Sequence, residues 1–224
     1  MTIADAQRRL GFRIENLKAV PVSRMLAEAK YEPTSGGEGI SKIKESVYGS
    51  IVQYLDTEGY PTEGNPDFNE ANVSDLVYAI ISPILSSFRR KTGRDVRLRR
   101  EREIISMTGE TGDREEFVVV DLVTVEEEQF ILMVEGKRSS LGQVMKQYLL
   151  AMKDMRDHNG EGKVYGFVTA REFWRMLSYD GTFEMTNNME VLFDTMDEEK
   201  ETWMKDHSVL VDCIYAVMSK GGRV

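Results

Sequence analysis

A strand, a helix and a second strand that follow one another in the second half of the chain constrain the fold most. Residues 130–134 form a continuous apolar run, and residues 164–169 form a second short buried strand. Between them, Ser139 or Ser140 caps an amphipathic helix that ends at Asn159-Gly160. A helical crossover joins strands that run in the same direction, so this unit predicts parallel pairing.

The residues around this unit predict a mixed sheet with helices on it. Residues 96–107, 117–125 and 130–134 read as three antiparallel strands, with turns at 108–112 and 126–128. Residues 174–179 and 182–186 read as a hairpin around Asp180-Gly181. Helical spacing predicts three further helices. The first covers 41–59 and the last about 200–218. The middle one is capped by Asn72 or Ser74, reaches Gly93 and is expected to kink at Pro83. The predicted fold class is α/β, with a mixed sheet flanked by helices.

The length of 224 residues fits one domain of ordinary to large size. Residues 1–37 have weak periodicity, contain Pro21 and Pro33, and end in Ser35-Gly36-Gly37, so they are predicted to be an N-terminal arm with one short helix. Residues 38–224 are then a single domain whose core spans about 72–186.

Several classes of protein are excluded or disfavoured. No apolar run approaches the roughly 18 residues of a membrane span, and the start of the chain lacks a signal-peptide core, so a soluble intracellular protein of the cytoplasm or nucleus is expected. The single Cys213 lies in an apolar periodic segment and reads as a buried, inert thiol. His158 and His207 are too far apart for metal-ligand spacing, and Gly-rich phosphate-binding motifs and the serine-hydrolase motif are absent from the sequence.

The charge is unevenly distributed. The net charge of -9 argues against a uniformly basic nucleic-acid binder. Residues 89–103, however, hold eight basic side chains against three acidic ones, and residues 110–135 hold nine acids against Arg114. A basic strip beside an acidic cluster is what a phosphate-handling site with metal-binding carboxylates needs, although both can also be ordinary solvated faces.

The strand over 130–134 ends in Glu135-Gly136-Lys137-Arg138. Residues two apart on a strand share a face, so Glu135 and Lys137 are expected side by side, and folding the hairpin about Glu127 puts Asp121 roughly across from Glu135. Two such carboxylates repel each other unless a cation such as Mg²⁺ or Mn²⁺ lies between them, and Lys137 could then deprotonate a water. The alternative is a salt bridge from Glu135 to Lys137 or Arg138.

These residues resemble the PD-(D/E)XK nuclease superfamily, which has the restriction-endonuclease-like fold, and also its Crinkler-type nuclease-like group. The family places an acid on its second strand, Glu-x-Lys on its third, and then a helix and another strand. The resemblance implies an αβββαβ core with extra terminal helices, a metal held by Glu135, the Gly136 carbonyl and either Asp121 or Glu116, and catalytic roles for Lys137 and Gln147. Glu116 stands where the Crinkler-type group usually has aspartate, and the proline that this group usually has just before that aspartate is absent here.

The leading hypothesis is therefore a Mg²⁺- or Mn²⁺-dependent nuclease acting on DNA or RNA, with Arg97, Arg99 and Arg138 contacting the phosphate backbone. On an alternating strand, Arg97 and Arg99 share a face and Arg100 points to the other. The competing hypothesis is a nuclease-like module without catalysis that binds nucleic acid, a protein partner or a second copy of the chain.

Overall fold

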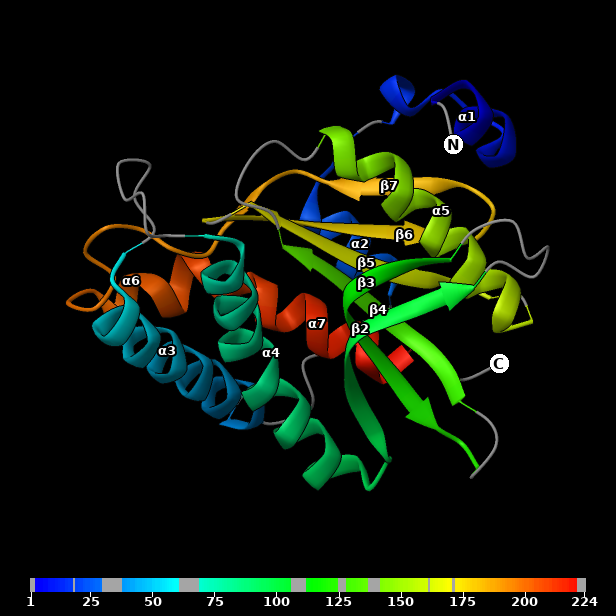
Figure 1. Ribbon diagram of the computed structural model, residues 1–224. Helices are drawn as coiled ribbons and strands as arrows, with labels where there is room; N and C mark the ends of the chain where they lie inside the picture. The colour runs from blue at the N-terminus through cyan, green and yellow to red at the C-terminus, as the bar shows by residue number, and fades with distance from the viewer. Residues whose placement is uncertain are drawn as a thin grey trace.

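The computed structural model describes residues 3–17, 19–29, 38–60, 69–105, 112–124, 128–136, 142–160, 162–170 and 172–220. These residues form one mixed, eight-stranded sheet with helices on both faces (Figure 1). In spatial order, the sheet consists of β1 (Ala19–Val20), β7 (Phe183–Thr186), β6 (Phe173–Tyr179), β5 (Val164–Ala170), β4 (Glu128–Gly136), β3 (Gly112–Leu122) and β2 (Val96–Ile105), while β8 (Met189–Glu190) pairs with β6.

The pairing directions follow the predicted topology. The strands β2, β3 and β4 form an antiparallel meander, and β4 pairs in parallel with β5. The crossover helix α5 (Gly142–His158) joins those two parallel strands. The hairpin of β6 and β7 is also present. The prediction of a mixed α/β sheet is confirmed.

The helices form a layer on each face of the sheet. One layer contains α3 (Glu38–Glu58), α4 (Glu70–Thr92) and α7 (Val209–Lys220), and α5 and α1 (Ile3–Leu10) lie on the other side (Figure 1). The short helices are α2 (Val22–Glu28), α6 (Lys200–Thr202), a 3-10 turn at Ile14–Asn16 and a π-helical turn at Trp203–His207. The last predicted helix is therefore divided into three segments.

Each layer buries its own hydrophobic core, because successive strand residues point to opposite faces. On β3, Val119 belongs to a first core with α3, α4 and α7, whereas Val118 and Val120 belong to a second core with α1 and α5. The segment predicted to be an arm contributes to both: Met25 of α2 is buried in the first, and Ala6 of α1 is buried in the second.

The helix α4 begins three to five residues earlier than predicted. Asn69 is the N-cap, and its side chain accepts a hydrogen bond from the backbone nitrogen of Ala71, while the Asn72 side chain accepts one from the backbone nitrogen of Asn69. Asn72 is thus the second half of a capping box. The helix continues through Pro83 and ends at Gly93, whose φ of 70° is the left-handed C-cap predicted there.

The segment Ala71–Thr92 of α4 is long and apolar enough to cross a membrane by length and composition. The same segment packs one face into the first core through Leu76, Ile80, Ile84 and Phe88. One face of the helix is thus packed against the core, and 39% of an 18-residue stretch of the segment is buried.

Candidate functional site

The buried carboxylate at the end of the central strand β4 is the centre of the candidate site. Glu135 is only 8% exposed. Its register partner on β5 is Val168, and Gly136 lies beside Thr169. Glu135 shares a strand face with Met133, which belongs to the second core, so Glu135 lies on the α5 side of the sheet. Burying a carboxylate at this place is costly unless a positive group or a proton compensates it.

The register of β3 and β4 decides which acid lies at the level of Glu135. Phe117 pairs with Val134, so the backbone of the preceding residue, Glu116, is at the level of Glu135. Asp121 instead pairs with Gln129, six residues along β4 from Glu135, which is about 20 Å on a strand. The prediction that Asp121 lies across from Glu135 is wrong. Leu122 pairs with Glu128, whereas a hairpin folded about Glu127 would pair Leu122 with Leu132.

Asp121 has a different partner, which comes from the other end of the meander. Its Oδ2 accepts hydrogen bonds from Arg94 Nε at 3.0 Å and Arg94 Nη2 at 2.6 Å. The Nη1 of the same guanidinium donates to the carbonyl of Met218 near the end of α7, at 2.9 Å. Asp121 therefore fixes the start of β2 and the last turn of α7, and its carboxylate is not available to a site at Glu135.

The remaining predicted catalytic residues are placed only in part. Lys137 and Arg138 lie outside the described residues, and Glu116 is described only by its position on β3. Gln147 is exposed on α5. The adjacent Tyr148 is buried, and its hydroxyl lies 2.9 Å from the carbonyls of both Met133 and Phe167, which attaches α5 to β4 and β5 close to Glu135.

Other titratable groups do not extend the site. Within the described ranges, no group of three or more His, Cys, Asp or Glu side chains is arranged to hold a metal ion. Cys213 is buried as predicted, and burial raises the pKa of its thiol to about 12, so it stays protonated at neutral pH. His158 and His207 each have a ring nitrogen near a backbone carbonyl, at 3.3 Å and 3.1 Å.

The basic strip lies on the edge strand β2. Arg97 pairs with Val120 and Arg99 with Val118, both from the second core, whereas Arg100 pairs with Phe117 from the first. The register thus agrees with the predicted faces. Arg97 Nε is 2.8 Å from Asp95 Oδ1, and Arg99 is exposed. The Arg100 guanidinium lies over two aromatic rings, 5.1 Å from the centroid of Phe117 and 5.7 Å from that of Tyr78.

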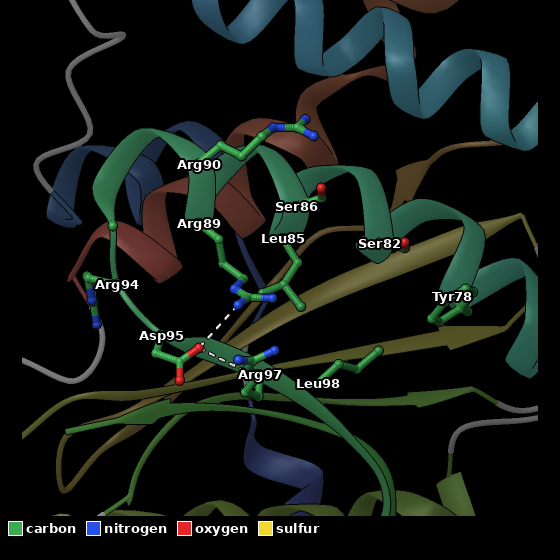
Figure 2. Close-up of a pocket in the computed structure, with 11 residues that line it drawn as sticks. Tyr78, Ser82, Leu85, Ser86, Arg89, Arg90, Arg94, Asp95, Arg97 and Leu98 are labelled. Atoms are coloured by element: carbon green, nitrogen blue, oxygen red, sulfur yellow. Dashed lines mark hydrogen bonds and ion pairs between the residues drawn. The ribbon is translucent and has the colours of Figure 1, made fainter. Parts of the chain in front are cut away.

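A groove of about 660 Å³ separates α4 from this edge strand. Figure 2 shows Arg89 from α4 and Arg97 from β2 both pointing toward Asp95, with Tyr78 at the opposite end. Sequence reasoning included Arg89 and Arg90 of α4 in the basic strip and assigned Arg97 to phosphate binding, but it did not predict that α4 and β2 form a groove. The missed signal is the four-residue spacing of Tyr78, Ser82, Ser86 and Arg90.

Comparison with models of known protein families and a search among curated proteins both find no match to this chain.

Proposed function

We propose that the chain is a metal-dependent nuclease with a restriction-endonuclease-like core, hydrolysing phosphodiester bonds of DNA or RNA in the cytoplasm or nucleus. The observation that carries the proposal is a buried carboxylate, Glu135, at the end of a central strand, with a second acidic residue, Glu116, at the same level of the adjacent strand. The element order α4-β2-β3-β4-α5-β5 supports it, because it is the αβββαβ order that the resemblance implies.

The donor set fits a hard divalent cation. Carboxylate and carbonyl oxygens are the ligands that Mg²⁺ and Mn²⁺ prefer, and two carboxylates at one strand end need a positive charge between them. Glu116, Glu135 and the Gly136 carbonyl are the proposed ligands. Bound there, the ion would supply Lewis-acid stabilisation of the charge that develops on the phosphoryl oxygens.

The protein groups supply the proton chemistry. Lys137 follows Glu135 by two residues, so it is expected on the same strand face, where its amine would orient a water and accept its proton. Asp121 is not included in this mechanism, because Arg94 holds its carboxylate about 20 Å along the strands. Gln147 on α5 remains a candidate contact to the substrate.

The first prediction tests this assignment by comparing the proposed catalytic residues with Asp121, an acid of the same hairpin. Glu135→Gln, Glu116→Gln and Lys137→Met should each lower cleavage by about a thousandfold, because each removes a metal ligand or the proposed base. Asp121→Asn should keep cleavage within about threefold while lowering the free energy of unfolding by about 1–2 kcal/mol, because it weakens the contact to Arg94. Cleavage of plasmid, single-stranded DNA and RNA with Mg²⁺ or Mn²⁺ is measured, with thermal unfolding of every variant as the folding control. Intact substrates with both ions would overturn the proposal.

A second function is a nuclease-like binding module without catalysis, with nucleic acid, another protein or a second copy of the chain as partner. The glutamate at position 116, where the Crinkler-type group usually has aspartate, favours it, as does the net charge of -9. Calorimetry separates the two: Mg²⁺ or Mn²⁺ binding that Glu135→Gln removes supports the nuclease, and retained ligand binding without cation affinity supports the module.

A further inference from the structure

We propose that the groove between α4 and β2 binds a short single-stranded nucleic acid, with phosphates at its arginine end and a base stacked on Tyr78. The inference deepens the proposed function, on which it rests for the choice of a nucleic acid. It depends on neither Glu135 nor a metal ion.

The wall of the groove on α4 is one stripe of the helix. Tyr78, Ser82, Ser86 and Arg90 recur every four residues, so they lie on one face, and the stripe is about 18 Å long at 1.5 Å per residue (Figure 2). The two serines are small and carry hydroxyls, so the middle of the groove is both open and able to form hydrogen bonds.

The arginine end has more positive charge than its carboxylates compensate. Four arginines, Arg89, Arg90, Arg94 and Arg97, line this end. Three of them pair with two carboxylates, Arg89 and Arg97 with Asp95 and Arg94 with Asp121, so four positive charges stand against two negative ones. Arg89 Nη2 and Arg97 Nε share a single oxygen, Asp95 Oδ1, at 3.2 Å and 2.8 Å.

One donor at this end is also unsatisfied. The Nε atom of Arg89 is buried and has no hydrogen-bond partner among the described residues. A buried donor without an acceptor is costly, and a phosphate oxygen is the acceptor that a guanidinium pairs with best. The buried Nε itself is covered, so a phosphate in the groove would be bound by the outer guanidinium nitrogens of Arg89 and its neighbours.

The opposite end offers an aromatic face. Tyr78 is 47% exposed although it lies on a core helix, and the Arg100 guanidinium lies over its ring, 5.7 Å from the centroid. The ring is held in place by this contact and still presents exposed surface. Phosphate contacts combined with an aromatic stacking platform are the usual means of binding single strands, whose bases are free to stack, whereas bases in a duplex are not.

The groove is directed toward the proposed catalytic end of the sheet. Arg97, at the arginine end, lies at the level of Val120, close to Asp121. Arg100, beside Tyr78, lies at the level of Phe117, next to Glu116. A strand in the groove would thus extend toward the end of the sheet that holds Glu135, along the α4 face of the sheet, whereas Glu135 itself lies on the α5 face.

The second prediction is tested by fluorescence anisotropy of a labelled oligothymidylate of about eight nucleotides, in EDTA so that no cleavage occurs. Ser86→Glu adds a negative charge to the groove without removing an existing contact, and it should weaken binding at least about tenfold. Gln53→Glu, on an exposed position of α3, is the matched control and should change affinity less than about twofold. Tyr78→Ala should weaken binding roughly fivefold to a hundredfold and Tyr78→Phe by less than about twofold, because the phenyl ring still stacks.

The outcomes separate this inference from the proposed function. Binding that Ser86→Glu and Tyr78→Ala weaken, in a protein that cleaves nothing with Mg²⁺ or Mn²⁺, supports the groove and overturns the nuclease. If cleavage depends on Glu135 but neither Ser86→Glu nor Tyr78→Ala changes the affinity for oligothymidylate, the groove inference alone is overturned. Thymidine monophosphate that competes as strongly as the oligonucleotide, or a duplex of equal length that binds as tightly, also overturns the inference.

Discussion

Two carboxylates of this protein, those of Asp121 and Asp154, are held by arginines that come from distant parts of the chain. Arg94 binds Asp121, and Arg9 of α1 binds Asp154 of α5 with Nη2 2.5 Å from Oδ1. The Asp154 side chain is 5% exposed and the Arg9 side chain 18%. Breaking such a pair from one side leaves a charge in a poorly solvated place, which costs more than the intact pair contributes.

The third prediction concerns Arg9. Burial raises the pKa of Asp154, and Arg9 lowers it by less. The folded chain therefore binds a proton at Asp154 more readily than the unfolded chain, so this residue's contribution to stability falls as pH rises above about 4. Arg9→Ala should cost about 2 kcal/mol at pH 7, and the deficit relative to the parent protein should shrink as the pH is lowered toward about 5, since protonation neutralises the unpaired carboxylate.

Urea unfolding at a series of pH values measures this effect. The control is Arg9→Ala combined with Asp154→Asn, which removes the titrating group and should make the difference from the parent independent of pH. A deficit for Arg9→Ala alone that stays constant between pH 7 and pH 5 would contradict the role given to the pair.

At the scale of single residues, sequence reasoning identified the position of Glu135 but assigned its neighbour wrongly. An apolar run that ends in a carboxylate is visible in the sequence, because strand burial is a local pattern. The neighbour depends on where the hairpin turns, and a shift of a few residues replaces Asp121 by Glu116. The partner of Asp121, Arg94, lies 27 positions earlier, and no local pattern predicts that contact.

At the scale of elements, the attachment of α5 to the sheet behind the candidate site depends on a glycine. A Cβ at Gly166 of β5 would lie 2.9 Å from the Cε1 and Cζ atoms of Tyr148, closer than real contacts allow. Since the Tyr148 hydroxyl lies between the carbonyls of Met133 and Phe167, the ring cannot move aside without losing both contacts. Only glycine lets the helix approach this closely.

The fourth prediction is that Gly166→Ala destabilises the protein by about 1–3 kcal/mol through overpacking. The matched control is Gly49→Ala in α3, where an added Cβ meets nothing within 4 Å; there the substitution should stabilise the protein by about 0.5–1 kcal/mol through better helix propensity. Urea unfolding measures both changes. Equal effects of the two substitutions would mean that the close approach at Gly166 is not a determinant of stability.

Element types were more predictable than their ends. The meander, the crossover and the β6-β7 hairpin follow from periodicity and turn residues. The parallel pairing of Ala19–Val20 with β7 does not, because a two-residue strand has no periodicity and its partner lies over 160 positions away. The backbone conformation of Glu101 was equally unpredictable. Its φ of 49° interrupts the alternation of β2, so that Ile104 lies in the second core, where regular alternation would have placed it in the first.

At the scale of the whole molecule, an acidic protein carries a locally basic groove. The net charge of -9 is spread over the chain, while four arginines line the space between α4 and β2. Charges further apart than about 8 Å are largely screened at physiological salt, so the local excess, rather than the total charge, determines what a ligand in the groove experiences. The total charge would still slow the approach of a polyanion at low salt.

The first 29 residues connect parts of the domain that lie far apart in sequence. The helix α1 packs on α5 and supplies Arg9 to Asp154, β1 covers the edge of β7, and Met25 of α2 is buried in the first core. This segment, expected from its sequence to be an arm, therefore contributes to both cores and to the edge of the sheet.

The fifth prediction is that a chain lacking residues 1–29 unfolds at a midpoint at least about 10 °C lower than the full chain, because several buried contacts are lost together with ion pairs to the rest of the domain, among them the buried pair of Arg9 and Asp154. It should also associate as concentration rises, because β7 becomes an uncovered edge strand. Thermal unfolding by circular dichroism and light scattering measure the two effects. Arg24→Ala, which removes only exposed ion pairs to Glu28 and Glu184 within the same region, is the control and should shift the midpoint by no more than about 2 °C. A truncated chain that unfolds within about 2 °C of the full chain and stays monomeric would show instead that residues 1–29 are dispensable to the fold.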